Sequence, residues 1–328
     1  MATDTATRQA ASMEESIRAL FNKDAALVWE ARRALLAGDP AGWDEIAFPA
    51  ELALELSSAC NLRCVMCPVS TTTRPAALMP DDIFRRAVNE AAGERGFILL
   101  PGGFGEVLLH PRWGELLAYA TARGIAPIVL LTNGMLLNER NVEWLLMLAV
   151  DVVMVSIDGV DPETYAKVRV KGDLPTVEAN VRRFLAQRGS APKPKLALRI
   201  IRMRDTAAQI DAFFDRWRPL LGPADGILIN EFNDWAGKVE DRGVLPATVA
   251  RPRRGPCRML WTNLSVHADG KVSACCYDSE DDLIIGNLAT GDTLAGIWRG
   301  EPLARLRRLH REERLEALPI CLACKYWS

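Results

Sequence analysis

Short apolar runs alternate with amphipathic stretches between residues 51 and 230, and this alternation predicts repeated strand–helix units. In the stretches expected to be helices, apolar residues return every three or four positions, so that one face can be buried. The expected strands cover residues 52–56, 97–100, 127–131, 152–156, 196–202 and 226–230. The expected helices cover residues 80–92, 111–123, 138–148, 175–187 and 206–218. Apolar strands separated by helices are typical of a parallel sheet covered by helices, so we predict an α/β fold of six βα-type units. Six units fall short of the eight of a closed barrel, and an open, partial (βα)6 barrel of the TIM type fits the pattern.

The segments on either side of this region differ from it. Before it, apolar residues at helical spacing in residues 12–36 predict a helix that ends at Gly38-Asp39-Pro40. We expect this N-terminal helical extension to cap the next domain, and a docking helix for a partner or leader peptide is the alternative. After it, residues 236–256 are rich in Arg, Gly and Pro and lack clear periodicity, which indicates a linker.

A small C-terminal domain follows the expected linker. Two apolar runs, 264–267 and 271–274, flank Asp269-Gly270 and predict a β-hairpin, and residues 295–311 predict a helix. The predicted order is a helical extension, an α/β domain, a linker and a small hairpin-and-helix domain, at residues 1–50, 51–235, 236–256 and 257–328.

Composition narrows the classes of function. The chain has 328 residues, a net charge of −2 and both charge signs mixed along its length, so no basic face points to a nucleic acid or an anionic membrane. The first twenty residues lack the apolar core of a secretion signal, and no uncharged stretch is long enough to span a bilayer. We therefore expect a cytoplasmic protein with no nucleic-acid partner and no membrane partner.

Eight cysteines fall into two groups. Because the cytosol keeps thiols reduced, clusters or metal ions explain them better than disulfides do. The first group is Cys60, Cys64 and Cys67, and the second is Cys257, Cys275, Cys276, Cys321 and Cys324. No cysteine lies between residues 68 and 256, which suggests two metal sites in two domains.

The first group has the spacing CxxxCxxC in a short loop after an apolar run. Three thiolates can hold three irons of a [4Fe–4S] cube and leave the fourth iron open to a small molecule. A structural zinc ion would need a fourth ligand nearby, and no other cysteine or histidine lies within forty residues. The run CNLRCVMCP at residues 60–68 resembles the signature of the radical S-adenosylmethionine (SAM) superfamily. The resemblance implies a partial (βα)6 barrel and a [4Fe–4S] cluster whose open iron binds SAM.

Glycines after the second expected strand fit a site for SAM. Glycines let backbone carbonyls approach a ligand closely, which suits the amino group of a methionine. The run GGFGE at residues 102–106 resembles the superfamily's GGE motif, although Phe104 separates the glycines. The resemblance implies that Gly103, Gly105 and Glu106 bind the cofactor.

Other predicted cofactor contacts also lie at strand ends. Ser156 begins a run, SIDG, that resembles the superfamily's S-x-D-G segment, which implies a contact with the SAM carboxylate or ribose, and a strand-end cap is the alternative. Arg169 is expected to pair with the carboxylate, and a surface charge is the alternative. Asn133 is a candidate ribose contact, unless it only forms a turn. In members of the superfamily, the backbone at the position of Met66 contacts the adenine of SAM, so the resemblance implies that Met66 is a cofactor contact.

The second cysteine group has enough ligands for a complete cluster. Cys257, Cys275, Cys321 and Cys324 come from a loop, the hairpin and a terminal CxxC, and can hold one [4Fe–4S] cluster. This set resembles the twitch domain, the shortened form of the SPASM domain, which implies an auxiliary [4Fe–4S] cluster. A zinc ribbon is the alternative, although it usually has two close cysteine pairs. Cys276 is then a buried neighbour of a ligand, a substitute for Cys275, or a hydrogen-atom donor to a substrate radical.

Two charged residues near the ends of the last strands are candidates for substrate contact. Glu231 follows the sixth expected strand and is a candidate polar contact or base. Arg202 ends the fifth expected strand and has the same status. For each of them, a solvated surface charge is the alternative.

The resemblance implies an oxidoreductase that cleaves SAM reductively to methionine and a 5′-deoxyadenosyl radical, which removes a hydrogen atom from the substrate. The single auxiliary cluster is similar to that of dehydrogenases of the 2-deoxy-scyllo-inosamine type from butirosin biosynthesis. This implies oxidation of a secondary alcohol of a sugar or aminocyclitol-like small molecule, with the auxiliary cluster as electron acceptor. The expected partners are that small molecule and a reductant such as flavodoxin or ferredoxin.

Three alternatives to this function stay open. The first is a radical epimerase in which Cys276 returns the hydrogen atom. The second is a SPASM maturase that modifies a ribosomal peptide or protein, although such enzymes often carry a winged-helix leader-binding segment. The third is a non-enzyme, either a two-cluster electron carrier or a zinc-stabilised scaffold.

Overall fold

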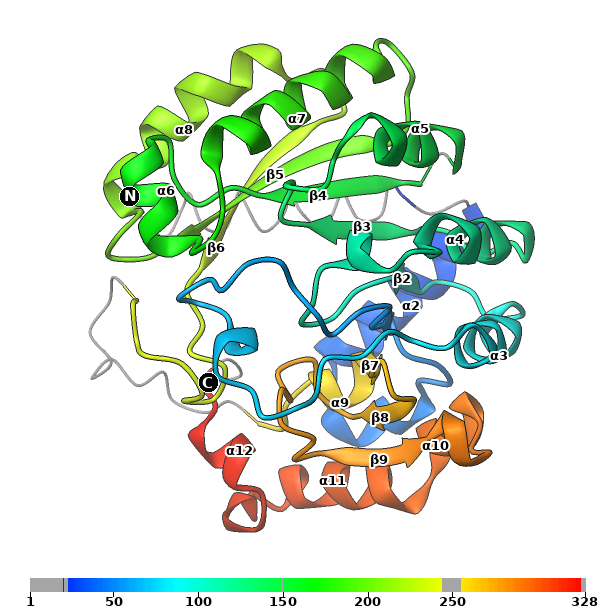
Figure 1. Cartoon of the computed structure of the whole chain (residues 1–328). Coiled ribbons are helices and arrows are strands. Elements are labelled where there is room, and N and C mark those ends of the chain that lie inside the picture. Colours follow the sequence, from blue (N-terminus) through cyan, green and yellow to red (C-terminus); the bar gives the residue numbers. More distant parts are fainter. Residues whose placement is uncertain (1–19, 21–22, 149, 244–254, 326–328) are drawn as a thin grey trace.

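The structure of the chain is a computed structural model, which describes residues 20, 23–148, 150–243 and 255–325. Two sheets form the centre of the molecule, and they lie next to each other, edge to edge (Figure 1). The first is the parallel sheet β3-β4-β5-β6, and the second has the order β2-β1-β7-β8-β9. A parallel bridge between Leu99 and Ile128 joins the two sheets.

The strands lie close to the ranges that the apolar runs predict, except for β9, which was not predicted. Those of the first sheet are β3 (Val129–Thr132), β4 (Val152–Ser156), β5 (Lys195–Arg202) and β6 (Gly226–Glu231). Those of the second sheet are β1 (Glu51–Leu54), β2 (Ile98–Leu100), β7 (Asn263–Val266), β8 (Lys271–Ser273) and β9 (Ile284–Asn287). The predicted α/β fold with a parallel sheet is confirmed.

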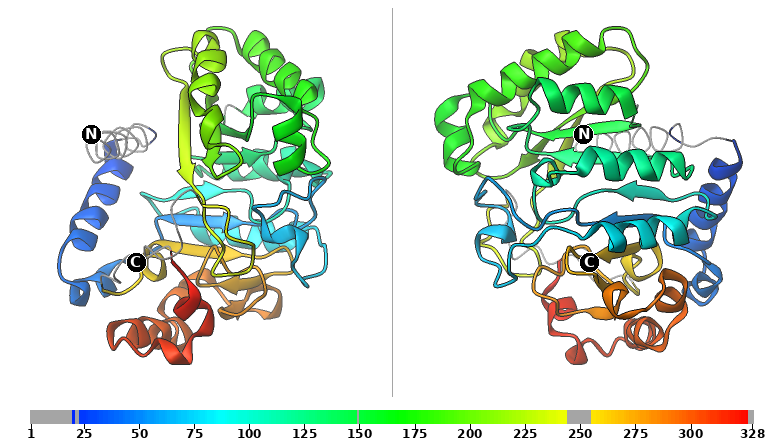
Figure 2. Two further views of the ribbon diagram at one scale, coloured as in Figure 1. Left: turned by 90° about the vertical axis from the view of Figure 1, so that its left-hand side faces the viewer. Right: turned by 45° about the vertical axis from the view of Figure 1, so that its right-hand side comes forward.

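Helices between the strands cover the outer side of the sheets (Figures 1 and 2). They are α3 (Asp81–Ala91), α4 (Trp113–Ala122), α5 (Glu139–Leu148), α6 (Pro162–Val168), α7 (Leu174–Arg188) and α8 (Ile210–Trp217). In α3, the apolar residues recur on one face, and Phe84, Ala87, Val88 and Ala91 are all buried. The predicted helix 206–218 begins as a 3-10 turn at Ala207–Gln209 and becomes α8 at Ile210.

The N-terminal extension is helical in its described part. α2 (Lys23–Ala37) precedes a 3-10 turn at Pro40–Glu45, and the side chain of Asp39 accepts a hydrogen bond from the backbone N–H of Ala41 (2.9 Å). The earlier part of the predicted helix 12–36 lies outside the described residues, apart from residue 20, as does the middle of the predicted linker.

The C-terminal region continues the sheet of the preceding domain. β7 pairs in parallel with β1, with Leu52 opposite Leu264, and then turns back as the predicted hairpin with β8. The helices of this region are α9 (Met259–Thr262), α10 (Leu294–Arg299), α11 (Glu301–Arg311) and α12 (Pro319–Ala323). The single helix predicted at 295–311 is therefore wrong. Gly300 has an extended backbone that ends α10, and α11 begins at Glu301, with Pro302 in its first turn.

One hydrophobic core runs through both sheets. Leu52, Leu130, Val153 and Leu264 are at most 1% exposed and belong to it. Among the described residues, no helix is both long enough and apolar enough to cross a membrane. The positions of the strands thus bring the loop after β1, the ends of β2–β5 and the C-terminal cysteines into one connected structure.

Candidate functional site

The three cysteines of the first group lie together in the loop after β1. Cys64 is buried, and Cys60 and Cys67 are partly buried against the same small apolar cluster. Two backbone hydrogen bonds fix the loop to the segment at the end of α6: Arg63 N–H donates to Val170 O (2.9 Å) and Val65 N–H to Val168 O (3.0 Å). Burial, with a smaller effect of the other two cysteines, raises the pKa of Cys67 to about 12. Such thiols ionise when a metal replaces the proton, so the donor set suits iron–sulfur ligation.

Glu106 joins the loop before the cysteines to the ends of β2 and β3. Its backbone N–H donates to Ala59 O (2.8 Å), directly before Cys60. Its buried carboxylate accepts from Leu108 N–H (3.2 Å), Thr132 Oγ1–H (2.8 Å) and Asn133 N–H (2.8 Å). Burial raises the pKa of this carboxyl group. The structure therefore brings Glu106 and Asn133 together, and these contacts give Glu106 an internal positioning role.

The glycines beside Glu106 are required by close packing. A Cβ on Gly105 would lie 2.1 Å from Ser57 O, and one on Gly103 would lie 2.9 Å from Cβ of Glu55. Real Cβ atoms do not come so close to other heavy atoms. Gly105 thus lets the GGFGE loop pass directly against the backbone that leads to Cys60.

Arg169 and Ser156 each have a buried partner. Arg169 forms an ion pair with Asp158 through Nε–H, which donates to Oδ2 (2.7 Å), and its Nη1 lies 3.6 Å from Cys64 Sγ. Ser156 Oγ accepts two hydrogen bonds from Arg199, from Nε–H (3.1 Å) and Nη2–H (2.7 Å). Arg169 therefore lies at the cysteine loop, and Ser156 is bound to Arg199. The prediction included neither Asp158 nor Arg199 as a site residue.

Arg199 is a site residue that the sequence reasoning missed. It lies on β5 opposite Ser156 on β4, so both side chains leave the sheet on the same face. Burial, followed by the charge of Arg169, lowers its pKa, while Asp158 and Cys67 act in the opposite direction. The signal in the sequence was a cation in the middle of the strand, between the apolar residues 196–198 and 200–201.

Asn133 and Met66 also lie at the cysteine loop. Asn133 Nδ2–H donates to Asn61 Oδ1 (2.8 Å), and the same nitrogen is 3.9 Å from Cys60 Sγ. The carbonyl of Met66 accepts a hydrogen bond from Trp235 Nε1–H (2.8 Å). Both predicted cofactor contacts are thus beside the three cysteines.

Four cysteines of the second group line one narrow cavity. Cys257, Cys275, Cys321 and Cys324 all face it, whereas Cys276 is absent from its lining. Burial, with a smaller effect of neighbouring cysteines, raises the pKa of both Cys257 and Cys275 to about 12. Four thiols around one cavity fit a four-iron cluster, in which each thiolate binds a different iron. Among the described residues, no three such side chains converge tightly enough for a single metal ion.

An aromatic contact links the two cysteine sites. Trp235, which donates to Met66 O, packs edge-on against Tyr277 with 5.0 Å between ring centroids. The backbone N–H of Tyr277 points at Cys275 Sγ (3.4 Å). Trp235 has a φ of 53°, a strained conformation for a bulky residue, so the surrounding contacts hold it in place.

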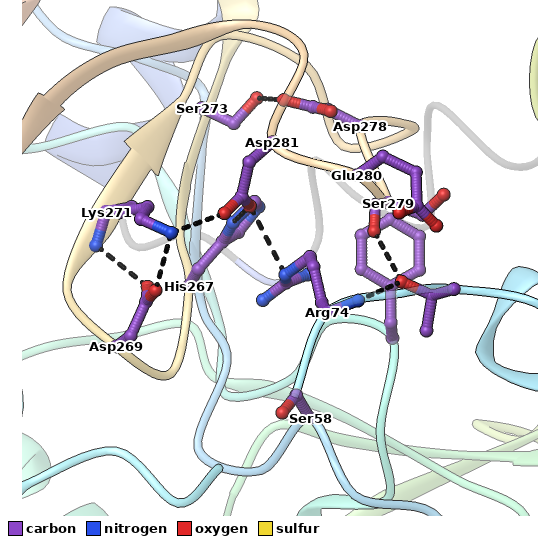
Figure 3. A network of polar contacts seen from close by, with 12 residues as sticks. Ser58, Arg74, His267, Asp269, Lys271, Ser273, Asp278, Ser279, Glu280 and Asp281 are labelled. Carbon is purple, nitrogen blue, oxygen red and sulfur yellow. Dashed lines mark hydrogen bonds and ion pairs between the residues drawn. The ribbon is translucent and has the colours of Figure 1, made fainter. Parts of the chain in front are cut away.

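A polar network around Arg74 and Asp281 also joins the two sites (Figure 3). Arg74, in the loop after the first cysteines, pairs with Glu55 (2.6 Å) and with Asp281 (3.2 Å). Asp281 follows the second cysteine hairpin and also contacts His267 (2.9 Å) and Lys271 (2.6 Å). Ion pairs therefore tie the loop of the first site to the loop of the second.

The predicted substrate residues are placed apart from this centre. Arg202 and Glu231 are register partners on β5 and β6, and their side chains approach to 3.5 Å. They are 42% and 62% exposed. Because strand residues alternate between faces, Arg202 leaves the sheet on the face opposite Arg199. The structure does not bring these two side chains to Ser156 and the cysteine loop.

Two family profiles match the chain. The Radical SAM superfamily profile covers residues 54–190, and that of the SPASM iron–sulfur cluster-binding domain covers residues 257–325. The two matches contain all eight cysteines of the chain.

Curated relatives share these regions. The AdoMet-dependent heme synthase of Methanosarcina barkeri is 38% identical over 122 residues, which are 37% of this chain and 34% of that protein. The mycofactocin maturase MftC of Mycobacterium ulcerans is 28% identical over 292 residues, or 79% of this chain and 77% of the maturase. The chain thus spans about a third of the heme synthase, and the similarity covers a shared part of that protein.

Solved structures share the fold. BtrN in complex with AdoMet and 2-DOIA has a TM-score of 0.58 and 16% identity, over 84% of this chain and 93% of BtrN. Streptococcus suis SuiB bound to precursor peptide SuiA has a TM-score of 0.65 and 16% identity, over 80% of this chain and 68% of SuiB. At this identity, the similarity shows a common fold.

Proposed function

The chain belongs to the radical SAM superfamily and carries a SPASM domain, and on this premise we propose that it oxidises a secondary alcohol of a sugar or aminocyclitol-like small molecule. A radical SAM domain implies a [4Fe–4S] cluster with bound SAM, and a SPASM domain implies auxiliary cluster binding. When bound, the first cluster and SAM supply a 5′-deoxyadenosyl radical, which can remove a hydrogen atom from carbon.

The residues of the first site have distinct parts in this proposal. Cys60, Cys64 and Cys67 would hold the first cluster. Asp158 keeps Arg169 beside Cys64. Glu106 fixes the backbone before Cys60 and the end of β3 at Asn133. These contacts make the site rigid before any ligand arrives, which is how a protein orients a reactive cofactor.

The observation that carries the proposal is the four-cysteine cavity and its aromatic connection to the first site. Cys257, Cys275, Cys321 and Cys324 would hold one auxiliary cluster, and Trp235 and Tyr277 lie between that cavity and Met66. Oxidation of an alcohol to a ketone removes one hydrogen atom, one proton and one electron. A second redox centre beside the first supports a reaction that must dispose of that electron.

The likeness to BtrN supports the substrate class. BtrN was solved with AdoMet and 2-DOIA and has one of the folds similar to this chain. The cysteine spacing of the C-terminal region also resembles the 2-deoxy-scyllo-inosamine dehydrogenase of butirosin biosynthesis. Substrate identity does not follow from a fold, so the aminocyclitol is part of the proposal.

The experiment that tests this function is isotope transfer. The reconstituted protein is incubated anaerobically with dithionite, SAM and an aminocyclitol deuterated at its ring carbons. We expect deuterium in 5′-deoxyadenosine and a ketone as product, both measured by mass spectrometry. In the Cys321→Ala variant, we expect 5′-deoxyadenosine without the ketone. Ketone formation at the wild-type rate in that variant would remove the electron-acceptor role of the second site.

Peptide modification is a second candidate function. The similarity to the maturase MftC covers 79% of this chain, and SuiB was solved with its precursor peptide. A peptide substrate would replace the aminocyclitol and would use the same radical and the same second site. If no deuterated polyol or aminocyclitol transfers deuterium, while a deuterated peptide does, this second candidate replaces the first.

A further inference from the structure

Cys257 also lines a second, larger cavity that opens at the surface. The cavity has a volume of about 540 Å³ and lies between α2, the start of β1 and the segment that leads into α9. Figure 2 shows α2 as a separate rod beside the sheet, with the first residues of β1 close by. The residues that line this cavity include Arg32, Arg33 and Arg258.

The lining is strongly basic. Arg33 and Arg258 are exposed, whereas Arg32 is 6% exposed and donates from Nη1 to the carbonyl of Gly96. Within the described ranges, neither Arg32 nor Arg258 has a carboxylate at ion-pair distance. Burial lowers the pKa of Arg32 to about 10, and the charge of Glu94 offsets part of this effect. The positive charges of Arg32 and Arg258, which no carboxylate of the described residues neutralises at ion-pair distance, favour a negatively charged ligand from outside.

One acid faces the same space. Glu51 is the single acidic residue among the described lining residues, and its carboxylate accepts a hydrogen bond from Asn263 Nδ2–H (2.7 Å). Burial raises the pKa of this carboxyl group. The lining therefore contains three arginines and one acid, Glu51, which gives it an excess of positive charge.

The position of Cys257 gives this basic cavity a relation to the second site. The same residue lines the narrow cavity that Cys275, Cys321 and Cys324 share. A protein seated in the outer cavity would therefore be separated from the proposed auxiliary site by this cysteine and its immediate neighbours. Short separation is what electron exchange between proteins requires.

We propose that this cavity is the docking site of an acidic one-electron carrier protein of the ferredoxin or flavodoxin class, whose carboxylates pair with Arg33 and Arg258 beside Cys257. The inference rests on the proposed function, which needs such a carrier. In each turnover, the alcohol carbon loses a hydrogen atom to the 5′-deoxyadenosyl radical, and the hydroxyl group loses its proton to solvent. The remaining electron leaves the substrate and reduces one oxidised carrier. It balances the one electron that a reduced carrier, or dithionite, supplies when SAM is cleaved to methionine and the radical.

Binding of a carrier protein in the absence of SAM and substrate tests this proposal without turnover. The probes are gallium-substituted ferredoxin and oxidised flavodoxin, titrated into the reconstituted protein by calorimetry at two ionic strengths. We expect binding of at least one probe that weakens steeply with salt. We expect the Arg33→Glu variant and the Arg258→Glu variant each to bind that probe about tenfold more weakly.

Two charge reversals elsewhere are the matched controls. Arg140 lies in the exposed first turn of α5 and Arg182 is exposed on α7, both away from the cavity. The Arg140→Glu and Arg182→Glu variants are expected to bind the probe within about twofold of the wild type, since they change the same net charge at another face. Iron content and circular dichroism confirm that each variant is folded and loaded.

The outcomes separate this inference from the proposed function. Failure of both probes to bind the wild type, or equal weakening in the control variants, would overturn the docking site. Formation of 5′-deoxyadenosine with dithionite needs no carrier protein, so it is measured in the same samples. If that reaction proceeds while docking fails, only the docking site is wrong. If the wild type forms no 5′-deoxyadenosine, the proposed function itself is wrong.

Discussion

Asp158 and Arg169 form an ion pair beside Cys64 that is almost completely buried. Asp158 is 0% exposed and Arg169 is 7% exposed. Asp158 also accepts a hydrogen bond from Ile201 N–H (2.6 Å), so the pair ties the cysteine loop to the end of β5. The predicted contact of Arg169 with the SAM carboxylate therefore has to be made by a guanidinium that already has an internal partner.

Removing one member of this pair should destabilise the protein strongly. In the Asp158→Asn variant, Arg169 keeps its charge in a buried position without a counter-ion, and the free energy of unfolding should fall by about 3–5 kcal/mol. The measurement is urea unfolding. The Asp158→Asn/Arg169→Met double variant removes the charge as well and should lose less than the single variant. A larger loss in the double variant would show that the pair contributes more than the buried charge costs.

Variants of Cys321 and Cys276 test which cysteines are ligands of the second site. Cys321 lines the four-cysteine cavity, and Cys276 does not. The Cys321→Ala variant should therefore lose about half of the iron of the wild type after reconstitution, while Cys276→Ala should retain all of it. Iron and sulfide analysis checks this. Iron loss in Cys276→Ala would make that residue a ligand.

Residues that form local motifs were predictable from the sequence, and residues that depend on folding were not. The spacing of Cys60, Cys64 and Cys67 is itself the chemical signal. The roles of Arg199 and Trp235 depend on contacts with residues distant in the sequence. Ser156 lies 43 positions before Arg199, and Met66 lies 169 positions before Trp235. No local pattern indicates such partners.

At the scale of elements, the loop after β2 shows how packing fixes a motif. Gly105 passes so close to Ser57 and Ala59 that a Cβ would lie 2.1 Å and 2.5 Å from their carbonyl oxygens. This approach holds Glu106 N–H against Ala59 O, one residue before the first cysteine. The glycine motif therefore positions the cysteine loop, whatever ligand its carbonyls also bind.

Adding one methyl group at this point should disturb the first site. The Gly105→Ala variant must move the backbone before Cys60, so we expect it to lose iron from the first site and to weaken SAM binding by at least about tenfold. Gly102→Ala is the matched control, because its Cβ would meet no atom within 4 Å. Equilibrium dialysis with labelled SAM gives the comparison. Similar affinity in both variants would contradict the packing argument.

The sequence predicts where helices and strands lie along the chain better than it predicts which side chains they bring together. The apolar periods predict strands and helices within a few residues, because burial of one face determines both patterns. Some details were not predicted: Gly300 divides the last predicted helix, and the helix α6 and the strand β9 have no counterpart in the prediction. The direction of Arg202 and Glu231 depended on the pleat of β5 and β6, and one residue of register decides the face.

At the scale of the whole molecule, the C-terminal region and the preceding domain share one sheet. β7 pairs with β1 over four register partners, and the network around Arg74 and Asp281 joins the loops above it. A sequence pattern reports which segments form strands, but pairing between strands more than two hundred positions apart comes from the tertiary fold. This shared sheet keeps the two cysteine sites at a fixed relation.

The ion pairs of this network should make stability depend on acid. Burial alone would raise the pKa of Asp281, but the hydrogen bond from Lys271 and the charges of His267 and Arg74 lower it below its ordinary value. A lowered carboxyl pKa contributes stability above the unfolded value of about 4, and this contribution is lost as the pH falls through the lower folded value. The free energy of unfolding should therefore fall more steeply below about pH 4 in the wild type than in Asp281→Asn. Urea unfolding of the iron-free proteins at several pH values tests this, and equal slopes would contradict it.

The central claim is that one chain holds two four-iron sites, one reactive and one that accepts electrons. The measurement that tests it most directly is the metal content of the anaerobically reconstituted protein, with 5′-deoxyadenosine assayed after addition of dithionite and SAM. We predict about eight irons per chain, no zinc and formation of 5′-deoxyadenosine, which the Cys64→Ala variant should abolish. About four irons with bound zinc would make the C-terminal site a structural scaffold and would contradict the proposed oxidation.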